Sequence, residues 1–136
     1  MIVNAIVEIP KNSIYKYEIK SRILYLDRVL NQSIPYNYGY IPDTLCEDRD
    51  PLDVFILSNR KIYPSTRVEI QIIGGFKCLD GGVSDDKLFG LLVGEKQPYD
   101  FTNDIRSYLT TYKTDFIIQK DLTKEEAIEV YLQSKI

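Results

Sequence analysis

The stretch Asp48-Arg49-Asp50-Pro51-Leu52-Asp53 runs directly into the apolar residues Val54-Phe55-Ile56-Leu57. Proline and the mixture of aspartate and arginine predict a loop, and the apolar run predicts a buried strand after it. Carboxylates this close together repel one another unless a positive charge lies among them. A rigid strand with clustered acids at its start suits hard divalent cations such as Mg²⁺, which take oxygen ligands. A solvated acidic turn is an equally good interpretation of these residues alone.

Length and composition limit the possible functions. The chain has 136 residues, of which 44% are hydrophobic and 27% charged, as is typical of a soluble globular protein. We therefore expect one domain over residues 1–136. The net charge of −3 argues against general nucleic-acid binding, which needs a basic surface.

The residue types that are present narrow the chemistry further. There is no histidine, which excludes His-based acid–base catalysis, Ser-His-Asp triads and His-containing zinc sites. Cys46 and Cys78 suggest neither a disulfide framework nor a CxxC pair. Hydrolytic chemistry would have to use carboxylates, lysine, arginine, tyrosine and metal ions. The apolar start, Met1–Pro10, lacks a basic region and contains Glu8, so we expect no signal peptide, no membrane span and a cytoplasmic location.

Patterns of short strands dominate the first two thirds of the chain. Strands are predicted at residues 2–9, 15–20, 22–30, 53–58, 67–73 and 87–93. Glycines at Gly74-Gly75 and at Asp80-Gly81-Gly82 predict turns. Short strands joined by turns favour a closed or nearly closed barrel.

The last third of the chain has helical patterns. One helix face is predicted from the spacing of Ile105, Tyr108, Leu109, Tyr112 and Phe116, with Thr102 or Asn103 as the cap. Thr123 and Glu126 form a capping-box pattern at the start of a second helix. We therefore expect an α+β fold in which a small barrel has two C-terminal helices packed outside it.

Several polar residues have both a structural and a functional interpretation. Lys16 and Glu18 fall on one strand face, where a solvated edge is the ordinary explanation. Glu8 lies on an apolar strand, where burial of an unpaired carboxylate is costly, so a salt bridge or a metal should compensate it. Asp27 and Arg28 are compatible with a surface ion pair. Taken singly, each residue favours the structural interpretation.

Taken in order, these residues match one pattern. Its segments are Val7-Glu8-Ile9-Pro10, Lys16-Tyr17-Glu18, Asp27-Arg28, Pro35-Tyr36-Asn37-Tyr38-Gly39-Tyr40-Ile41-Pro42, Asp48 to Val54, the Asp80, Asp85 and Lys87 spacing, and Tyr112-Lys113. This order resembles the family I soluble inorganic pyrophosphatases over Ile6 to about Lys113. The D-x-D-P-x-D core after N-Y-G-Y-I-P is highly specific.

The resemblance implies a fold, a reaction and partners. The fold is a five-stranded OB-like β-barrel. The reaction is Mg²⁺-dependent hydrolysis of pyrophosphate to two phosphates by metal-activated water, without a covalent intermediate. Several Mg²⁺ ions would bind in each site, with Mn²⁺ or Zn²⁺ as substitutes. The expected partner is this small-molecule substrate, with no nucleic acid and no membrane, and the expected assembly is a homo-oligomer.

The resemblance also implies residue roles. The metal ligands would be Asp48, Asp53, Asp80, Asp85, Glu8 and Glu18. Asp50 would orient and deprotonate the attacking water, with Tyr38 nearby. The phosphate oxygens would be bound by Lys16, Arg28, Lys87, Tyr112 and Lys113. Lys16 would have Glu18 as its charge partner. These seven carboxylates and four cations carry a net charge of −3, so metal must bind before an anionic substrate is attracted.

Two departures from the family pattern motivate an alternative. The family usually has glycine where this chain has Arg49, and tyrosine where it has Ile34. The segment 88–111 and the tail are also short. The alternative is a catalytically weakened homologue that serves as a metal- or phosphate-binding module. An EF-hand is excluded at Asp48–Asp53, because the required glycine and glutamate are absent.

Overall fold

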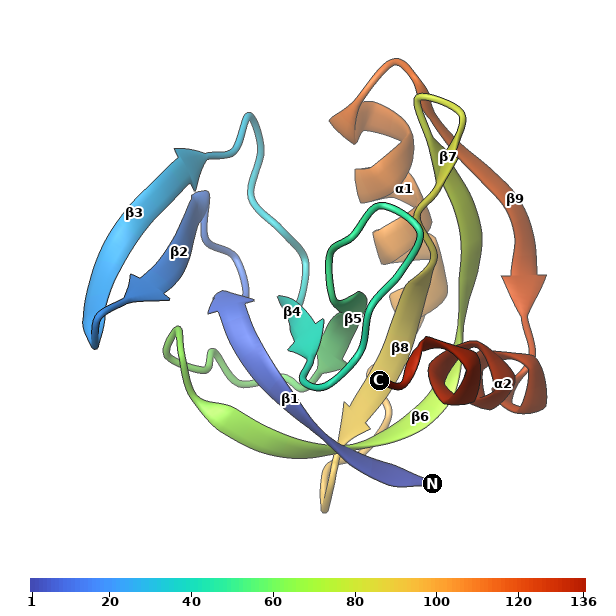
Figure 1. The fold of residues 1–136 in the computed structure, drawn as a ribbon, viewed down its shortest axis with the longest axis horizontal. Helices are drawn as coiled ribbons and strands as arrows, with labels where there is room; N and C mark the ends of the chain where they lie inside the picture. Colours follow the sequence, from blue (N-terminus) through green and yellow to red (C-terminus); the bar gives the residue numbers. More distant parts are fainter.

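Five strands form a closed ring in the computed structural model, which describes residues 1–136 (Figure 1). Their order around the ring is β1 (Ile2–Ile9), β4 (Asn37–Ile41), β5 (Leu52–Leu57), β8 (Lys87–Leu92) and β6 (Arg67–Asp80), and β6 pairs back onto β1. All of these pairs are antiparallel except β5–β8. The ring and two helices confirm the predicted sheet-dominated fold.

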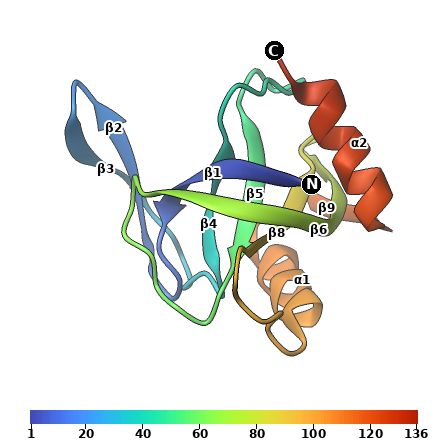
Figure 2. The same ribbon diagram turned by 90° about the horizontal axis from the view of Figure 1, so that it is seen from below.

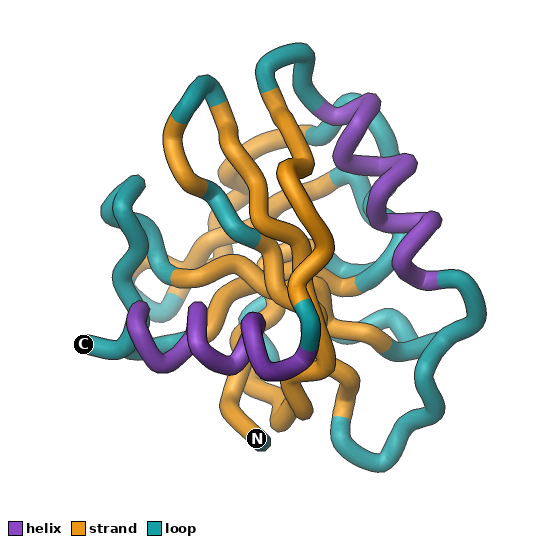
Figure 3. Tube along the Cα trace, turned by 90° about the vertical axis from the view of Figure 1, so that its right-hand side faces the viewer, coloured by secondary structure: helices purple, strands orange, loops and turns teal.

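The remaining elements extend this ring. A separate two-stranded sheet, β2 (Tyr15–Lys20) with β3 (Ile23–Val29), projects from one side (Figure 2). Short strand β7 (Val83–Ser84) and strand β9 (Phe116–Leu122) both pair with β6. Helices α1 (Phe101–Tyr112) and α2 (Lys124–Ser134) lie on separate sides of the strands (Figure 3).

Two apolar clusters hold the helices against the sheet. Helix α1 contributes Ile105 and Leu109 to a cluster that contains Phe55, Phe76 and Phe89. Helix α2 contributes the fully buried Ala127 to the cluster on the other side and packs against β6. Apolar packing on both faces thus holds the strands that carry the site. Fully burying one such apolar side chain stabilises the fold by about 2 kcal/mol.

The start of α2 was predicted correctly, and the start of α1 was not. At α2 the Thr123 side chain accepts a hydrogen bond from the Glu126 backbone, and the Glu126 side chain accepts one from the Thr123 backbone. The N-cap of α1 is Asp100, in the left-handed region at φ 58°, and not Thr102 or Asn103. Asn103 instead donates to the Asp100 side chain over 2.7 Å.

Two further predictions were wrong. Phe116 continues the helical spacing in number, but the helix ends at Tyr112 and Phe116 opens strand β9. The pair Gly74-Gly75 is not a turn, because it lies inside the long strand β6. A Cβ atom on Gly75 would lie 2.7 Å from the Lys87 carbonyl oxygen, so glycine is needed for the close approach of β8. The second glycine segment does form the predicted turn, at residues 81–82 between β6 and β7.

Neither helix combines the length and the apolar content that a membrane-spanning segment requires.

Candidate active site

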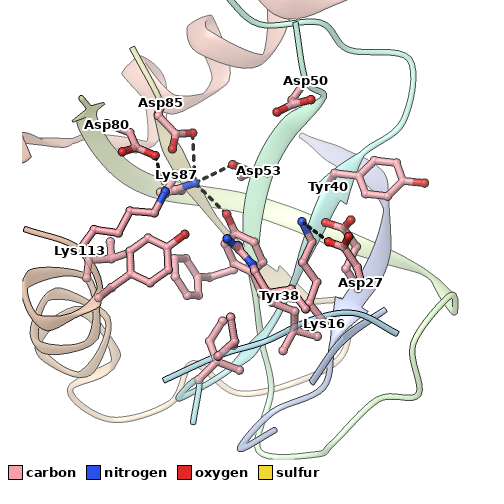
Figure 4. A pocket seen from close by; sticks show the side chains of 18 of the residues that line it. Lys16, Asp27, Tyr38, Tyr40, Asp50, Asp53, Asp80, Asp85, Lys87 and Lys113 are labelled. Atoms are coloured by element: carbon pink, nitrogen blue, oxygen red, sulfur yellow. Dashed lines mark hydrogen bonds and ion pairs between the residues drawn. The ribbon is translucent and has the colours of Figure 1, made fainter. Parts of the chain in front are cut away.

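A polar cavity of about 610 Å³ lies between the strand ring, the β2–β3 sheet and the end of α1. All thirteen residues that the sequence singled out line this cavity, although they are drawn from segments far apart in the chain. They are Glu8, Lys16, Glu18, Arg28, Tyr38, Asp48, Asp50, Asp53, Asp80, Asp85, Lys87, Tyr112 and Lys113. Figure 4 labels Lys16, Tyr38, Asp50, Asp53, Asp80, Asp85, Lys87 and Lys113 from this set.

The register of the sheet sets the centre of the cavity. Asp53, the second residue of β5, stands beside Lys87, the first residue of β8, in the parallel β5–β8 pair. On the other side of β5, Asp53 is paired with Tyr40 and Phe55 with Tyr38. Alternate residues of a strand point to the same face, so this face presents acid, base and phenol side chains together. The ring of Tyr38 packs edge-on against that of Phe55, with the ring centroids 4.9 Å apart.

The ammonium group of Lys87 contacts several polar side chains at the centre of the cavity (Figure 4). Its Nζ lies 2.6 Å from Asp53 Oδ2 and 3.1 Å from Asp85 Oδ1, and it donates to the Tyr38 hydroxyl over 2.8 Å. Lys87 is 4% exposed. Burial alone would lower its pKa, but Tyr38, Asp53 and Asp85 together outweigh burial and hold the pKa above its usual range. These three partners therefore favour the charged form of the buried Lys87 side chain.

The acidic loop, residues 42–51, is held by hydrogen bonds where it leaves β4 and enters β5, and its middle is exposed. Buried Thr44 accepts from the Leu52 backbone over 2.8 Å and donates to the Ile41 carbonyl over 2.6 Å, which ties the two ends of the loop together. The Asp50 backbone donates to Asp48 Oδ1 over 3.0 Å. The Asp50 carboxylate stands at the cavity wall without an interaction to the other labelled side chains (Figure 4). Its carboxylate oxygens are therefore not engaged by an ion pair within the chain.

Arg49 and Ile34, the two departures from the family pattern, lie in different environments. Arg49 is exposed, is not part of the cavity lining, and has φ 68°. This left-handed conformation favours glycine, which explains the glycine that the family usually has at this position. Ile34 is 1% exposed, belongs to the apolar cluster around Phe55 and Phe76, and lines the cavity.

The β2–β3 sheet supplies a wall with charges of both signs. Lys16 pairs with Asp27 at 3.5 Å, and Glu18 pairs with Lys20 at 3.0 Å, so the expected pairing of Lys16 with Glu18 was wrong. The register places Lys16 opposite Arg28 and Tyr17 opposite Leu26, which leaves Asp27 as the extra residue of a bulge. A bulge turns neighbouring residues to one side, so both Asp27 and Arg28 line the cavity.

The end of α1 supplies the opposite wall. Tyr112 is the last helical residue, and its ring stacks on that of Tyr108 with the centroids 5.7 Å apart. Lys113 follows it and pairs with Asp80, the last residue of β6, at 2.8 Å. A second ion pair therefore lies across the cavity from Lys16.

The electrostatics of the cavity favour a bound cation. Burial, reinforced by Asp53 and Asp27 against the opposing effect of Lys16, raises the pKa of Glu8 to about 7. Burial also raises the pKa of Asp85 to about 6, despite the nearby Lys87. The lining has eight carboxylates and four cations, a formal charge of −4. A metal ion would relieve both the burial and the repulsion.

The donor set fits a hard divalent metal. It consists of carboxylate oxygens, the ligands that Mg²⁺ and Ca²⁺ take. No three carboxylates converge on one point in this structure, in which Lys87 occupies the space between Asp53 and Asp85. Metal binding would therefore need these carboxylates to rearrange around the ion.

The sequence did not single out two polar residues of the lining as site residues. Asp27 was interpreted as half of a surface ion pair, and Tyr40 as part of a motif without a role of its own. Asp27 could have been found only from the β3 bulge, which no residue pattern indicates. Tyr40 could have been found from strand periodicity, since it alternates with Tyr38 on β4.

Known proteins resemble this chain in sequence and in fold. The family model for inorganic pyrophosphatase matches residues 5–134. A soluble inorganic pyrophosphatase from Zea mays is 36% identical over 141 residues, covering 96% of this chain and 65% of that protein. Soluble inorganic pyrophosphatase 5 from Arabidopsis thaliana is 33% identical over 147 residues, covering 98% and 65%. The chain thus spans slightly less than two thirds of these plant proteins.

A solved structure of an inorganic pyrophosphatase resembles this chain in fold. The crystal structure of an inorganic pyrophosphatase from Neisseria gonorrhoeae superimposes with a TM-score of 0.88 at 28% identity, covering 98% of this chain and 88% of that chain. The match spans the cavity residues from Glu8 to Lys113, so it includes the candidate site as well as the ring. The resemblance found in the motifs is confirmed: the chain belongs to the inorganic pyrophosphatase family.

Proposed function

We propose that this chain hydrolyses inorganic pyrophosphate to two phosphate ions with the help of divalent metal ions, Mg²⁺ in the first place. The observation that carries the proposal is the single cavity lined by all seven proposed carboxylates and all four proposed cations. Acids and bases from six separate segments share this space, and the centre is held by sheet register.

Asp50 is the proposed base. Water attacks one phosphorus atom, the bond from that atom to the bridging oxygen breaks, and the second phosphate leaves with the bonding electron pair. The water proton moves to the Asp50 carboxylate, which is exposed and free of ion pairs. The Tyr38 hydroxyl accepts a hydrogen bond from Lys87, so its own O–H points away from Lys87. The hydroxyl can therefore donate a hydrogen bond to an oxygen atom in the cavity.

Six carboxylates are the proposed metal ligands: Asp48, Asp53, Asp80, Asp85, Glu8 and Glu18. A bound metal lowers the pKa of coordinated water and offsets charge on the phosphate oxygens. The chain contributes the negative charge that would hold such ions, and Asp53 and Asp85 share the Lys87 ammonium group in the metal-free site. Mn²⁺ and Zn²⁺ are the proposed substitutes.

The phosphate oxygens are the proposed ligands of Lys16, Arg28, Lys87, Tyr112 and Lys113. Arg28 belongs to none of the ion pairs of the structure, so its guanidinium is available for bidentate binding. Lys16 and Lys113 are each held by one partly exposed carboxylate, which a phosphate can replace at little cost.

The weakened-homologue alternative draws no support from Arg49, because this residue is absent from the cavity lining. We further propose a cytoplasmic location and assembly into a homo-oligomer, with no nucleic-acid partner.

Release of phosphate from pyrophosphate tests the proposal. Purified chain is assayed with Mg²⁺, with EDTA, and with Ca²⁺ in place of Mg²⁺. We expect release with Mg²⁺ and none with EDTA. If Mg²⁺ produces no release while calorimetry detects binding of Mg²⁺ or phosphate, the binding-module alternative is correct.

A further inference from the structure

Gln32 connects two parts of the chain that carry opposite walls of the active-site cavity. Its side-chain Nε2 donates to the Tyr108 carbonyl over 3.1 Å and to Thr111 Oγ1 over 2.7 Å, both near the end of α1. Gln32 itself belongs to residues 30–36, which join β3 to β4 and lie between the β2–β3 sheet and α1 (Figure 1). Two side-chain hydrogen bonds thus link the β2–β3 side of the cavity to the helix.

The backbone around Gln32 continues the pairing of the β2–β3 sheet. Leu30 donates to the Ile14 carbonyl over 2.6 Å, and Ile34 donates to the Ser13 carbonyl over 3.1 Å. Residues 30–34 are therefore held against the segment that precedes β2. A displacement of this base would move the whole sheet, and with it Arg28, which lines the cavity from β3.

Like charges lie on the two walls. Arg28 lines the cavity from β3, and Lys113 lines it from the residue that follows α1. The hydrogen bond to Asp80 raises the pKa of Lys113, while burial and the positive charge of Arg28 lower it. Arg28 has no ion-pair partner of its own. Without a bound anion, repulsion between the two cations therefore favours separation of the walls.

Apolar packing brings the two walls together but does not fix their spacing. Leu30 and Ile34, on either side of Gln32, are buried in a cluster that also contains residues of α1. Apolar contacts are non-directional, whereas a hydrogen bond requires a defined distance and angle. The other polar contact between this segment and the helix, from Tyr36 to Asp104, lies at the opposite end of α1. At the cavity end, Gln32 supplies the directional contacts.

We propose that Gln32 is a positioning residue, which sets the distance between Arg28 and the end of α1 and so determines how tightly the cavity binds an anion with two phosphate groups. The proposal rests on the proposed function, in which Arg28, Tyr112 and Lys113 bind phosphate oxygens. Gln32 is not part of the cavity lining, so it acts through these residues. If its two hydrogen bonds are lost, binding must first bring the walls back together, which lowers the apparent affinity.

Two substitutions test the amide of Gln32. Gln32→Met keeps a side chain of similar length but cannot donate a hydrogen bond. Gln32→Glu keeps the shape but turns a negative charge toward the end of α1, where the helix dipole is negative and no basic residue lies in the last turn. Gln133→Met is the matched control, because Gln133 is exposed on α2 outside the cavity and donates to Glu129 over 3.1 Å. Circular dichroism and urea unfolding establish that each variant is folded.

The separate values of KM and kcat for pyrophosphate with Mg²⁺ distinguish a positioning role from a general loss of structure. Phosphate ligands act on the bound substrate and on the transition state alike. We therefore expect Gln32→Met to raise KM about 10-fold and to leave kcat within about 3-fold. Gln32→Glu should raise KM further, and Gln133→Met should change neither constant. An unchanged KM in both Gln32 variants, or an equal rise in Gln133→Met, would overturn the proposal.

Binding of imidodiphosphate, in which nitrogen replaces the bridging oxygen of pyrophosphate, provides a second measurement that needs no turnover. Calorimetry with Mg²⁺ present should give a Kd about 10-fold higher for Gln32→Met than for the unaltered chain. In an Arg28→Met background the same substitution should raise Kd less than about 3-fold, because the repelling pair is already absent.

The calorimetric results also separate this proposal from the proposed function. An unchanged Kd in Gln32→Met, or a full 10-fold rise in the Arg28→Met background, would contradict the role of Gln32 in spacing the walls. Weaker binding in Gln32→Met, together with no phosphate release from the unaltered chain, would refute the proposed function and leave the role of Gln32 standing.

Discussion

Lys87 and Asp53 face each other across the parallel β5–β8 pair, with Nζ 2.6 Å from Oδ2. Because the strand register places the two residues side by side, backbone pairing sets the position of both side chains. The pair also includes Asp85, so one buried cation compensates two carboxylates. The consequences of this arrangement can be measured.

Replacement of Lys87 by methionine should strongly destabilise the metal-free protein. The variant keeps the side-chain volume but leaves Asp53 and Asp85 without their cation, and breaking a buried pair in this way costs about 3–5 kcal/mol. Urea unfolding in EDTA measures the loss. Lys113→Met, which removes an exposed pair, should cost about 0–1 kcal/mol. Equal losses in the two variants would contradict the role of Lys87.

The stability of the metal-free protein should fall as pH rises from about 4.5 to 7. The pKa of Glu8 is raised in the folded state to about 7. Its contribution is therefore fully present below the unfolded pKa of about 4.5 and is lost as pH passes through the folded pKa. Asp85, with a pKa of about 6, acts in the same direction. Chemical unfolding in EDTA at a series of pH values measures this slope.

Glu8→Gln should reduce that slope. The amide cannot ionise, so the variant should lose about 1–3 kcal/mol less than the wild type between pH 5 and 8. The slope due to Asp85 remains in the variant as an internal reference. Mg²⁺ should reverse the loss in the wild type at pH 8, since a cation stabilises the ionised carboxylates. Identical slopes for the two proteins would rule out an elevated pKa at Glu8.

Arg49→Gly should stabilise the protein. The backbone at this position has φ 68°, which costs about 1 kcal/mol more for arginine than for glycine. Thermal unfolding should show a higher midpoint, with phosphate release unchanged because Arg49 lies outside the cavity lining. Arg49→Ala removes the same side chain without freeing the backbone, so it should give no gain. A gain with alanine would assign the effect to charge and not to conformation.

Asp50→Asn should keep the fold and lose most turnover. The asparagine cannot accept the water proton, and loss of a general base typically costs about 100-fold or more. Stability in urea should change little, because the Asp50 contact to Asp48 is made by its backbone. Asp115→Asn, an exposed acid outside the lining, is the control. Near-normal turnover of the Asp50 variant would remove Asp50 from the reaction.

Local patterns predicted most of the strands and the start of the second helix. Ile2–Ile9 and Tyr15–Lys20 are strands with the predicted bounds, and Thr123 caps α2 as its sequence indicates. These features depend on residues close together in the chain. Periodicity and capping chemistry are therefore enough to predict them.

The errors arose where distant segments decide the conformation. Phe116 fits the helical stripe, but the helix ends at Tyr112, the chain turns at residues 114–115, and Phe116 packs into the core from β9. Gly75 looks like a turn residue, yet it allows β8 to approach β6. The shared cavity of the site residues followed from the family motif, whereas the pairing of Lys16 with Asp27 depends on a bulge.

The buried ammonium of Lys87 also bears on the order in which this protein matures. Clusters of acids that rely on an external ion must wait for that ion before the chain can close around them. Here the chain itself provides the counter-ion, the Lys87 ammonium group. The pairing of β5 with β8 places this group between Asp53 and Asp85. Folding can therefore be completed without a bound metal ion, and metal loading becomes a later step in which Asp53 and Asp85 exchange Lys87 for the ion.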